Sequence, residues 1–324
     1  MKISRLLLAC LIAATGSAAF AAKFNLKMGH AVNTTDGQHA AALKLAELVK
    51  QRTNGDVEIT VFPSNQLGND GAMINGVRGG TIDIVSSGAS NYNGLVANTA
   101  AMELPFVFRN AQHAYHVLDG DIGTGVLNEL APHNMKGLAY WENGWRAFTN
   151  NKRPVNKPED LKGLKIRSTP NPYHIQAFKL LGMNPSPMPI AELYTALESG
   201  AFDAQEHPIN VTWSSKFYEV QKHLTVSNHV YSPIIVAMNK GKFDSLPANY
   251  QKIVVDAARE AAKYQRDLNA QNAGKVVADL KKSGMQVIEN VDMAPFQKIV
   301  SAEIAKTFGE KNGTALLNAI EATK

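Results

Sequence analysis

The chain has 324 residues, of which 45% are hydrophobic and 19% are charged, so it can bury the cores of two domains and is not a disordered chain. Its formal net charge is +5 at pH 7, but the basic residues are dispersed, which excludes a basic stripe of the kind that binds nucleic acid. After the N-terminal region, no segment approaches the about 20 apolar residues that a membrane span needs.

Residues 1–22 have the pattern of a secretory signal peptide. Lys2 and Arg5 precede an apolar run over 6–14, and we expect cleavage after Ala21, which leaves a mature chain of net charge +3. The only cysteine, Cys10, lies in the apolar run. A lipid anchor at this cysteine is a less favoured alternative, because a leucine two residues earlier fits such a signal poorly. The mature chain has no cysteine and therefore no disulfide.

The first third of the mature chain alternates strand and helix patterns. Apolar alternation and helical spacing predict, in order, a strand over 23–30, a helix over 38–52, a strand over 57–61, a helix over 70–78 and a strand over 81–86. This alternation predicts an α/β fold with a mostly parallel sheet covered by helices.

The middle of the chain contains the pattern of an anion site. A strand over 137–140 leads into a crossing between lobes at 141–146 and a connecting loop at 151–158. A short strand then carries Arg167 to a helix that starts with Asn171 as its cap. Free N–H groups at a helix start and a guanidinium both favour a carboxylate, so we expect an anion here.

A second strand near 202–205 should lie parallel to the first, because a helical crossover joins them. Its exit residues Glu206 and His207 then reach the same sheet edge as Arg167, the edge at which open α/β sheets bind ligands. The same residues also fit an Arg167 that pairs with Glu206 on the surface beside a structural histidine. Spacing alone leaves both interpretations open.

An internal echo links two parts of the chain. Residues 74–83 and 194–203 share an order of helix, Gly, small residue, apolar residue and Asp. On this overlay Ser87 corresponds to His207, since each lies four residues after the Asp. We interpret the echo as two lobes of one design that present their strand ends to a common cleft.

The last part of the chain is mainly helical. A return strand is predicted over 231–238, followed by a helix over 248–282 and a final helix over 295–308. The helix over 248–282 lacks proline, and at roughly 1.5 Å per residue it can run past both lobes.

Sequence motifs of common enzymes and metal sites are absent. The chain has no GxSxG elbow, Walker loop or dinucleotide-binding glycine motif after a strand. The closest histidine pairs, His113 with His116 and His30 with His39, lack further ligands at metal spacing. We therefore expect no metal, no cofactor and a protein that binds rather than catalyses.

Five motifs follow one another along nearly the whole mature chain: 62–70 (FPSNQLGND), 161–167 (LKGLKIR), 181–188 (LGMNPSPM), 192–197 (ELYTAL) and 203–208 (DAQEHP). They resemble those of the solute-binding proteins of TRAP transporters, the DctP family. Motifs at 76–83, 139–146 and 204–211 look most like those of a member that binds 2,3-diketo-L-gulonate. The resemblance implies a two-lobed, type II-like periplasmic-binding-protein fold. In this fold we expect lobe I to comprise 22–143 and 233–273 and lobe II to comprise 144–232 and 274–324, with the long C-terminal helix spanning both.

The resemblance also implies a periplasmic receptor, not an enzyme, that closes on an organic acid and delivers it to the membrane permease of a TRAP transporter. Arg167 matches the arginine that pairs with the ligand carboxylate, Arg146 a second cleft arginine of some members, and Asp70 a position at the cleft lip. His207 stands where many relatives have Asn, and an imidazole still fits a carboxylate by donating one hydrogen bond or, when protonated, by adding charge.

The remaining site residues implied by the resemblance are polar amides, namely Gln38, Asn91 and Asn171. Such groups suit a polyhydroxylated acid, so we predict a six-carbon sugar acid, whether uronate, aldonate or ketogulonate. A C4-dicarboxylate or small keto acid is an alternative that would use Arg146 as a second clamp. A remote alternative is a periplasmic sugar-acid lyase or isomerase with His207 as base.

Overall fold

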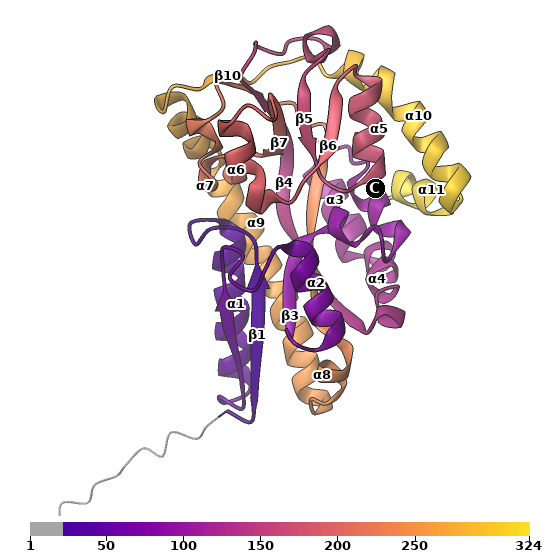
Figure 1. Cartoon of the computed structure of the whole chain (residues 1–324). Coiled ribbons are helices and arrows are strands. Elements are labelled where there is room, and N and C mark those ends of the chain that lie inside the picture. The colour runs from indigo at the N-terminus through magenta and orange to yellow at the C-terminus, as the bar shows by residue number, and fades with distance from the viewer. Residues whose placement is uncertain (1–21) are drawn as a thin grey trace, which may run out of the picture.

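The structure, a computed structural model, describes residues 22–324, so the predicted signal peptide at 1–21 lies outside the described residues. Strands and helices alternate along the chain (Figure 1). The strands are β1 (Phe24–His30), β2 (Val57–Phe62), β3 (Ile84–Gly88), β4 (Met135–Asn150), β5 (Lys165–Ser168), β6 (Asn184–Pro187), β7 (Ala204–Pro208), β8 (His223–Thr225), β9 (Tyr231–Asn239) and β10 (Gln286–Ile288). The helices are α1 (Gly37–Arg52), α2 (Asp70–Gly79), α3 (Ala111–Asp119), α4 (Asp121–Asn128), α5 (Pro172–Leu180), α6 (Ile190–Glu198), α7 (Ile209–Ser214), α8 (Lys240–Asp244), α9 (Ala248–Lys282), α10 (Ala294–Asn312) and α11 (Ala315–Ala322).

The strands form a mixed sheet with parallel ends and an antiparallel middle. Its main path runs β2-β1-β3-β9-β4-β7-β5-β6, and β8 pairs with both β4 and β10. The pairs β1–β2 and β1–β3 at one end and β5–β6 and β5–β7 at the other are parallel, as predicted. Strand β9 is antiparallel to β3 and β4, and β4 is antiparallel to β7. The α/β class and the two-lobed arrangement are confirmed (Figure 1).

A single long strand, β4, connects the two halves of the sheet. Its first part pairs with β9, and its last five residues pair with β7. The crossing predicted at 141–146 includes the point at which β4 changes its partner from β9 to β7. A register shift falls between Glu142 and Gly144, and Gly144 has a φ of +121°. A β-carbon at Gly144 would lie 3.3 Å from Cβ of Pro208, so the bulge depends on glycine.

The internal echo is confirmed by a matched pair of contacts. Asp83 follows α2, and its Oδ2 accepts a hydrogen bond of 2.7 Å from the backbone N of Lys27 in β1. Asp203 follows α6, and its Oδ2 accepts one of 3.0 Å from the backbone N of Lys165 in β5. In both lobes the aspartate thus ties the end of a helix to the neighbouring parallel strand.

Helix α9 runs along both halves and has the bounds predicted from the sequence. It packs against α1 and β4 near its start and against α7 and β10 farther along. Four alanines of α9 are buried, which allows the helix backbone to approach β4 closely, and Trp141 Nε1 donates to the Ala258 carbonyl at 2.9 Å. The sequence prediction of a helix that spans both lobes is confirmed.

Sequence reasoning missed several elements, namely the helices α3, α4, α7, α8 and α11 and the strands β6, β8 and β10. Strand β6 has the sequence Asn-Pro-Ser-Pro, and its two prolines disfavour a strand. Helix α11, expected to be a tail, packs against α4, and its carbonyls accept hydrogen bonds from Arg109 and contact His113 of α3. The lobe boundaries stay a prediction. Both α10 and α11 belong to the predicted lobe II, but α11 contacts α4, which belongs to the predicted lobe I.

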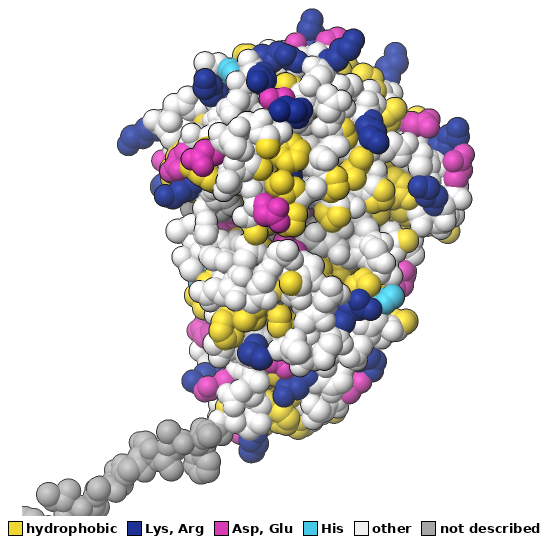
Figure 2. Space-filling model, viewed as in Figure 1, with side chains coloured by type: hydrophobic (Ala, Val, Ile, Leu, Met, Phe, Trp, Pro, Cys, Tyr) yellow, Lys and Arg dark blue, Asp and Glu magenta, His cyan; other side chains and the backbone are white. Residues whose placement is uncertain are grey.

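On the face shown in Figure 2, Lys and Arg side chains are spread over both ends of the molecule and do not gather in a stripe. None of the helices between residues 22 and 324 combines the length and apolarity that crossing a bilayer requires.

The bulge in β4 predicts a difference between two glycine substitutions. Gly144→Ala should lower the free energy of unfolding by about 1–3 kcal/mol, because L-residues rarely adopt its positive φ. Gly79→Ala is the matched control, since Gly79 is helical and its added methyl meets no atom within 4 Å. The control should be neutral or slightly stabilising. Urea unfolding of the two variants measures both effects, and equal stability of the two would contradict the role of Gly144.

Candidate ligand-binding site

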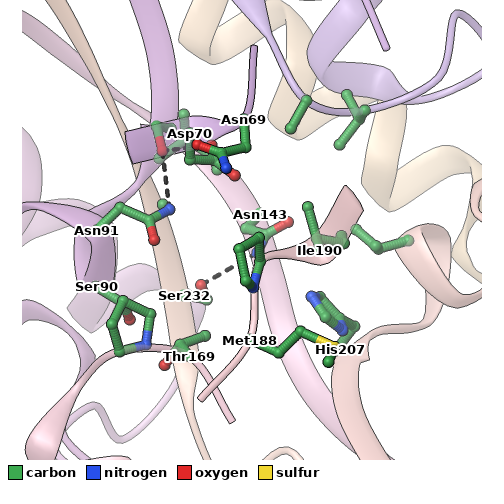
Figure 3. A pocket seen from close by; sticks show the side chains of 18 of the residues that line it. Asn69, Asp70, Ser90, Asn91, Asn143, Thr169, Met188, Ile190, His207 and Ser232 are labelled. Carbon is green, nitrogen blue, oxygen red and sulfur yellow. Dashed lines mark hydrogen bonds between the residues drawn. The ribbon is translucent and has the colours of Figure 1, made fainter. Parts of the chain in front are cut away.

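A cavity of about 320 Å³ lies where the two halves of the sheet meet. Figure 3 shows Asp70 and Asn91 on one side of it and Met188, Ile190 and His207 on the other. Its volume is at the lower end of the range of roughly 300–1,000 Å³ that is typical of small-molecule sites. The lining therefore comes from both lobes and suits a small ligand.

Most of the predicted site residues line this cavity. The topology brings together the places where they lie: the ends of β5 and β7, the starts of α1 and α2, a position within β4, and the short helix after β3. The lining includes Gln38, Asp70, Asn91, Arg146, Arg167 and His207.

Asn171 is the exception and does not line the cavity. It is fully buried as the N-cap of α5, where its Oδ1 accepts from the backbone N of Tyr173 at 2.9 Å. The helix start was predicted correctly, but the same side-chain oxygen that makes Asn171 a good cap is then not available to a ligand.

Arg167 is buried and lacks a carboxylate partner. Its Nε donates to the Met188 carbonyl at 2.8 Å, and its Nη1 lies 3.4 Å from His207 Nε2. Among residues 22–324, no carboxylate oxygen forms an ion pair with its guanidinium. Burial and the nearby Arg146 lower the pKa of Arg167 to about 10, so it still carries its charge at neutral pH. A buried, unpaired cation of this kind favours an anion in the cavity.

Arg146 is held differently, by Glu206. Its Nε and Nη2 both donate to the Glu206 carboxylate, with 2.7 Å from Nη2 to Oε1, and both side chains are almost fully buried. Burial opposes the charge of both groups, yet their mutual attraction prevails, raising the pKa of Arg146 and lowering that of Glu206. Glu206 therefore pairs with Arg146, and the alternative pairing with Arg167 on the surface is wrong.

His207 is buried beside the two arginines. Its Nδ1 contacts Oε1 of Gln205, and its ring lies 5.7 Å from that of Phe217. Burial, together with the charges of Arg146 and Arg167, holds the pKa of His207 well below its usual value. The imidazole is therefore neutral in the ligand-free site.

The opposite side of the cavity presents hydroxyl, amide and carboxylate groups. Ser87 at the end of β3 donates to Asp70 Oδ1 at 2.6 Å and accepts from Asn91 Nδ2 at 2.9 Å. Gln38 Nε2 donates to the hydroxyl and carbonyl oxygens of Ser86. Burial raises the pKa of Asp70, although Ser87 and the charge of Arg167 counteract the shift. These groups can exchange hydrogen bonds with several ligand hydroxyls.

Sequence reasoning missed a second set of polar lining residues. Glu103 accepts hydrogen bonds from Ser90 and Ser232, and Asn143 Nδ2 donates to Ser232 Oγ at 3.2 Å. A lone acidic residue in the apolar segment 100–105 was the available signal for Glu103, because an unpaired buried carboxylate is costly. The further polar residues missed are Asn69 and Thr169.

The histidine pairs do not form metal centres. His30 Nε2 and His39 Nδ1 are 3.0 Å apart and hydrogen-bonded to each other. Within the part of the chain that the structure describes, no three potential ligands lie close enough together to hold a metal ion.

Comparisons with known proteins agree with this geometry. The model of the family "Bacterial extracellular solute-binding protein, family 7" (DctP) matches residues 28–311. The chain is 45% identical to the 2,3-diketo-L-gulonate-binding periplasmic protein YiaO of Escherichia coli (strain K12), over 96% of this chain and 95% of that protein.

Two solved structures show the same fold. A TRAP periplasmic solute-binding protein from Polaromonas sp. JS666, bound to D-erythronate, superposes with a TM-score of 0.90 at 36% identity over 93% of this chain and 99% of that chain. A second such protein, from Sulfurospirillum deleyianum DSM 6946 with bound succinate, has a TM-score of 0.88 at 31% identity over 94% of this chain and 100% of that chain. The chain thus belongs to the DctP family of TRAP transporter solute-binding proteins.

Proposed function

We propose that this protein is the extracytoplasmic receptor of a TRAP transporter and that it binds a sugar acid through Arg167. The observation that carries the proposal is the buried guanidinium of Arg167, which has no ion-pair partner within residues 22–324 and faces a cavity of small-ligand size. A ligand carboxylate would accept two parallel hydrogen bonds from its terminal nitrogens.

Binding would be coupled to closure of the two lobes. Arg167 and His207 come from the β5–β7 side, whereas Asp70, Asn91 and Gln38 come from the β1–β3 side. A ligand that contacts both sides stabilises the closed arrangement over the open one, because only closure makes all contacts available. We place the lobes at 22–143 with 233–273 and at 144–232 with 274–324, so that the bulge at Gly144 falls at their junction.

The polar lining favours a sugar acid over a dicarboxylate. A second carboxylate needs a second free cation, and Arg146 lines the cavity but is engaged on two nitrogens by Glu206. Asp70 and Glu103 on the cavity wall would also repel a second carboxylate, whereas they can accept hydrogen bonds from hydroxyls. The similarity to a diketogulonate-binding protein supports a six-carbon acid, and the relative with succinate keeps the dicarboxylate as the alternative.

Arg167→Ala should weaken binding of the ligand by about 2–5 kcal/mol, roughly 30-fold or more, since the carboxylate loses its bidentate partner. The affinity of Arg167→Lys should lie between those of Arg167→Ala and the unaltered protein, because lysine keeps the positive charge but cannot form the two parallel hydrogen bonds of a guanidinium. Arg259→Ala, which removes an exposed arginine of α9, is the matched control and should bind as the unaltered protein does. Calorimetric titration measures the three affinities, and an unchanged affinity in Arg167→Ala would exclude the proposed carboxylate site.

A ligand screen identifies the acid. Thermal unfolding of the ligand-free mature protein with gluconate, D-glucuronate, D-galacturonate, 2,3-diketo-L-gulonate and D-erythronate should show a rise of several degrees for one or more of them. A ligand at about 100 times its Kd adds about 2.7 kcal/mol of stability. Succinate and malate are the comparison acids. A rise with these two alone would instead make Arg146 a second carboxylate clamp and replace the sugar acid by a C4-dicarboxylate.

The proposal also covers location, partners and the absence of catalysis. We propose that residues 1–21 direct export to the periplasm, that a TRAP permease accepts the ligand, and that the acid leaves the site unchanged. A lyase or isomerase would need a base at His207. Proton NMR of the bound acid during prolonged incubation should show no product, and turnover would revive the enzyme alternative.

A further inference from the structure

Behind His207 lies a chain of buried side-chain hydrogen bonds whose direction is fixed at its far end. Gln221 Nε2 lies 3.1 Å from the Val220 carbonyl and 3.5 Å from the Asp203 carbonyl. Carbonyl oxygens only accept, so the amide nitrogen of Gln221 must face them and its Oε1 must face the opposite way, toward Thr149. The orientation of this amide is therefore set by the backbone.

The orientation of the Gln221 amide determines the direction of each following hydrogen bond, as far as the imidazole of His207. Thr149 Oγ1 donates to Gln221 Oε1 at 2.9 Å, so its oxygen accepts from Gln205 Nε2 at 2.8 Å. Gln205 then presents Oε1 to Nδ1 of His207, and this oxygen can only accept. His207 must carry its proton on Nδ1, since two acceptors would otherwise face each other in a buried place.

The cavity-facing nitrogen of His207 is consequently an acceptor. The charged groups around the ring are the guanidinium groups of Arg167 and Arg146, and both oppose a second proton on it. The Nη1 group of Arg167, 3.4 Å away, is placed to donate to Nε2. A neutral ring with its proton on Nδ1 cannot donate from Nε2 to a carboxylate, contrary to the sequence expectation of a donated hydrogen bond.

We propose that His207 selects acids with a hydroxyl group on the carbon next to the carboxylate, by accepting a hydrogen bond from that hydroxyl at Nε2. The inference rests on the proposed function, because it takes the carboxylate to be bound by Arg167. His207 Nε2 lies 3.4 Å from Nη1 of Arg167, so the carbon next to a carboxylate bound by Arg167 comes within reach of His207. When the carboxylate takes the terminal N–H groups of Arg167, Nε2 loses the donor it has in the ligand-free site. The substituent on the adjacent carbon must then donate, or a buried acceptor is left unpaired.

This requirement divides the candidate sugar acids. An aldonate carries an O–H group on the carbon next to its carboxylate. A uronate in its ring form carries the ring oxygen there, and a 2-keto acid carries a carbonyl oxygen, and both of these only accept. The site should thus prefer aldonates, and other 2-hydroxy acids of similar size, over cyclic uronates and 2-keto acids.

The tautomer can be tested without any ligand. Two-bond ¹⁵N–¹H correlation spectra of protein labelled at histidine distinguish a ring protonated on Nδ1 from one protonated on Nε2 and from a doubly protonated ring. The signal is assigned by its loss in His207→Asn. We expect the neutral Nδ1–H form at pH 7. A proton on Nε2, in either the neutral or the charged ring, would overturn the inference.

The selectivity is tested with a matched pair of acids, D-gluconate and 2-deoxy-D-gluconate, which differ only in the hydroxyl at C2. Gluconate should bind about tenfold or more tightly, because the deoxy acid leaves Nε2 unpaired. In His207→Asn the amide can rotate to donate instead, so the two affinities should converge to within about threefold.

A second variant separates the hydrogen-bond chain from the ligand contact. Thr149 is fully buried and does not line the cavity, and Thr149→Val removes the hydroxyl that orients Gln205. The Nε2–H tautomer should then appear in the spectrum and the preference for gluconate should decrease. Equal binding of both acids by the unaltered protein overturns the inference and leaves the proposed function intact. Binding of neither acid at any concentration tested, with a dicarboxylate bound instead, overturns both.

Discussion

The buried guanidinium of Arg167 is the constraint on which the rest of the site depends. A cation withdrawn from water is costly unless an anion and hydrogen bonds replace the lost hydration. Among the residues that the structure describes, the neighbouring acidic group, Glu206, is paired with Arg146, and the close polar partners of Arg167 are the Met188 carbonyl and the His207 ring. Within residues 22–324 the charge of Arg167 thus has no carboxylate at ion-pair distance, which is why we propose that a ligand carboxylate supplies the counter-ion.

The pairing of Arg146 with Glu206 is what makes the two arginines different. Both guanidinium groups line one small cavity, and without Glu206 they would together favour two anionic groups. Neutralising one of them leaves Arg167 as the positive group on its side of the cavity, opposite the hydroxyl, amide and carboxylate groups of the other side. A molecule with one carboxylate and many hydroxyls matches that distribution of charge.

The predictability of the fold and the site follows from the range of the forces involved. Local patterns were sufficient for α9 and for the helix start at Asn171, because apolar periodicity and capping act within a few residues. The same patterns could not reveal that Glu206 pairs with Arg146, which lies 60 residues away, or that Asn171 faces its own helix and not the cavity. Partners of buried polar groups are decided by packing between distant segments, and one sequence carries no direct record of that packing. Glu103 was missed for the same reason, although an acid within an apolar segment indicated that some buried partner must exist.

The end of the chain has a mechanical consequence. Helix α10 packs against α5, which begins just after Arg167, whereas α11 packs against α4 and α3 beyond a turn at Gly313, which has a φ of +79°. The two sides of the cavity are thus joined along one edge by β4, β9 and α9 and along another by this terminal helix pair. Opening of the proposed cleft would therefore have to be accommodated at this terminal helix pair as well as in β4, β9 and α9.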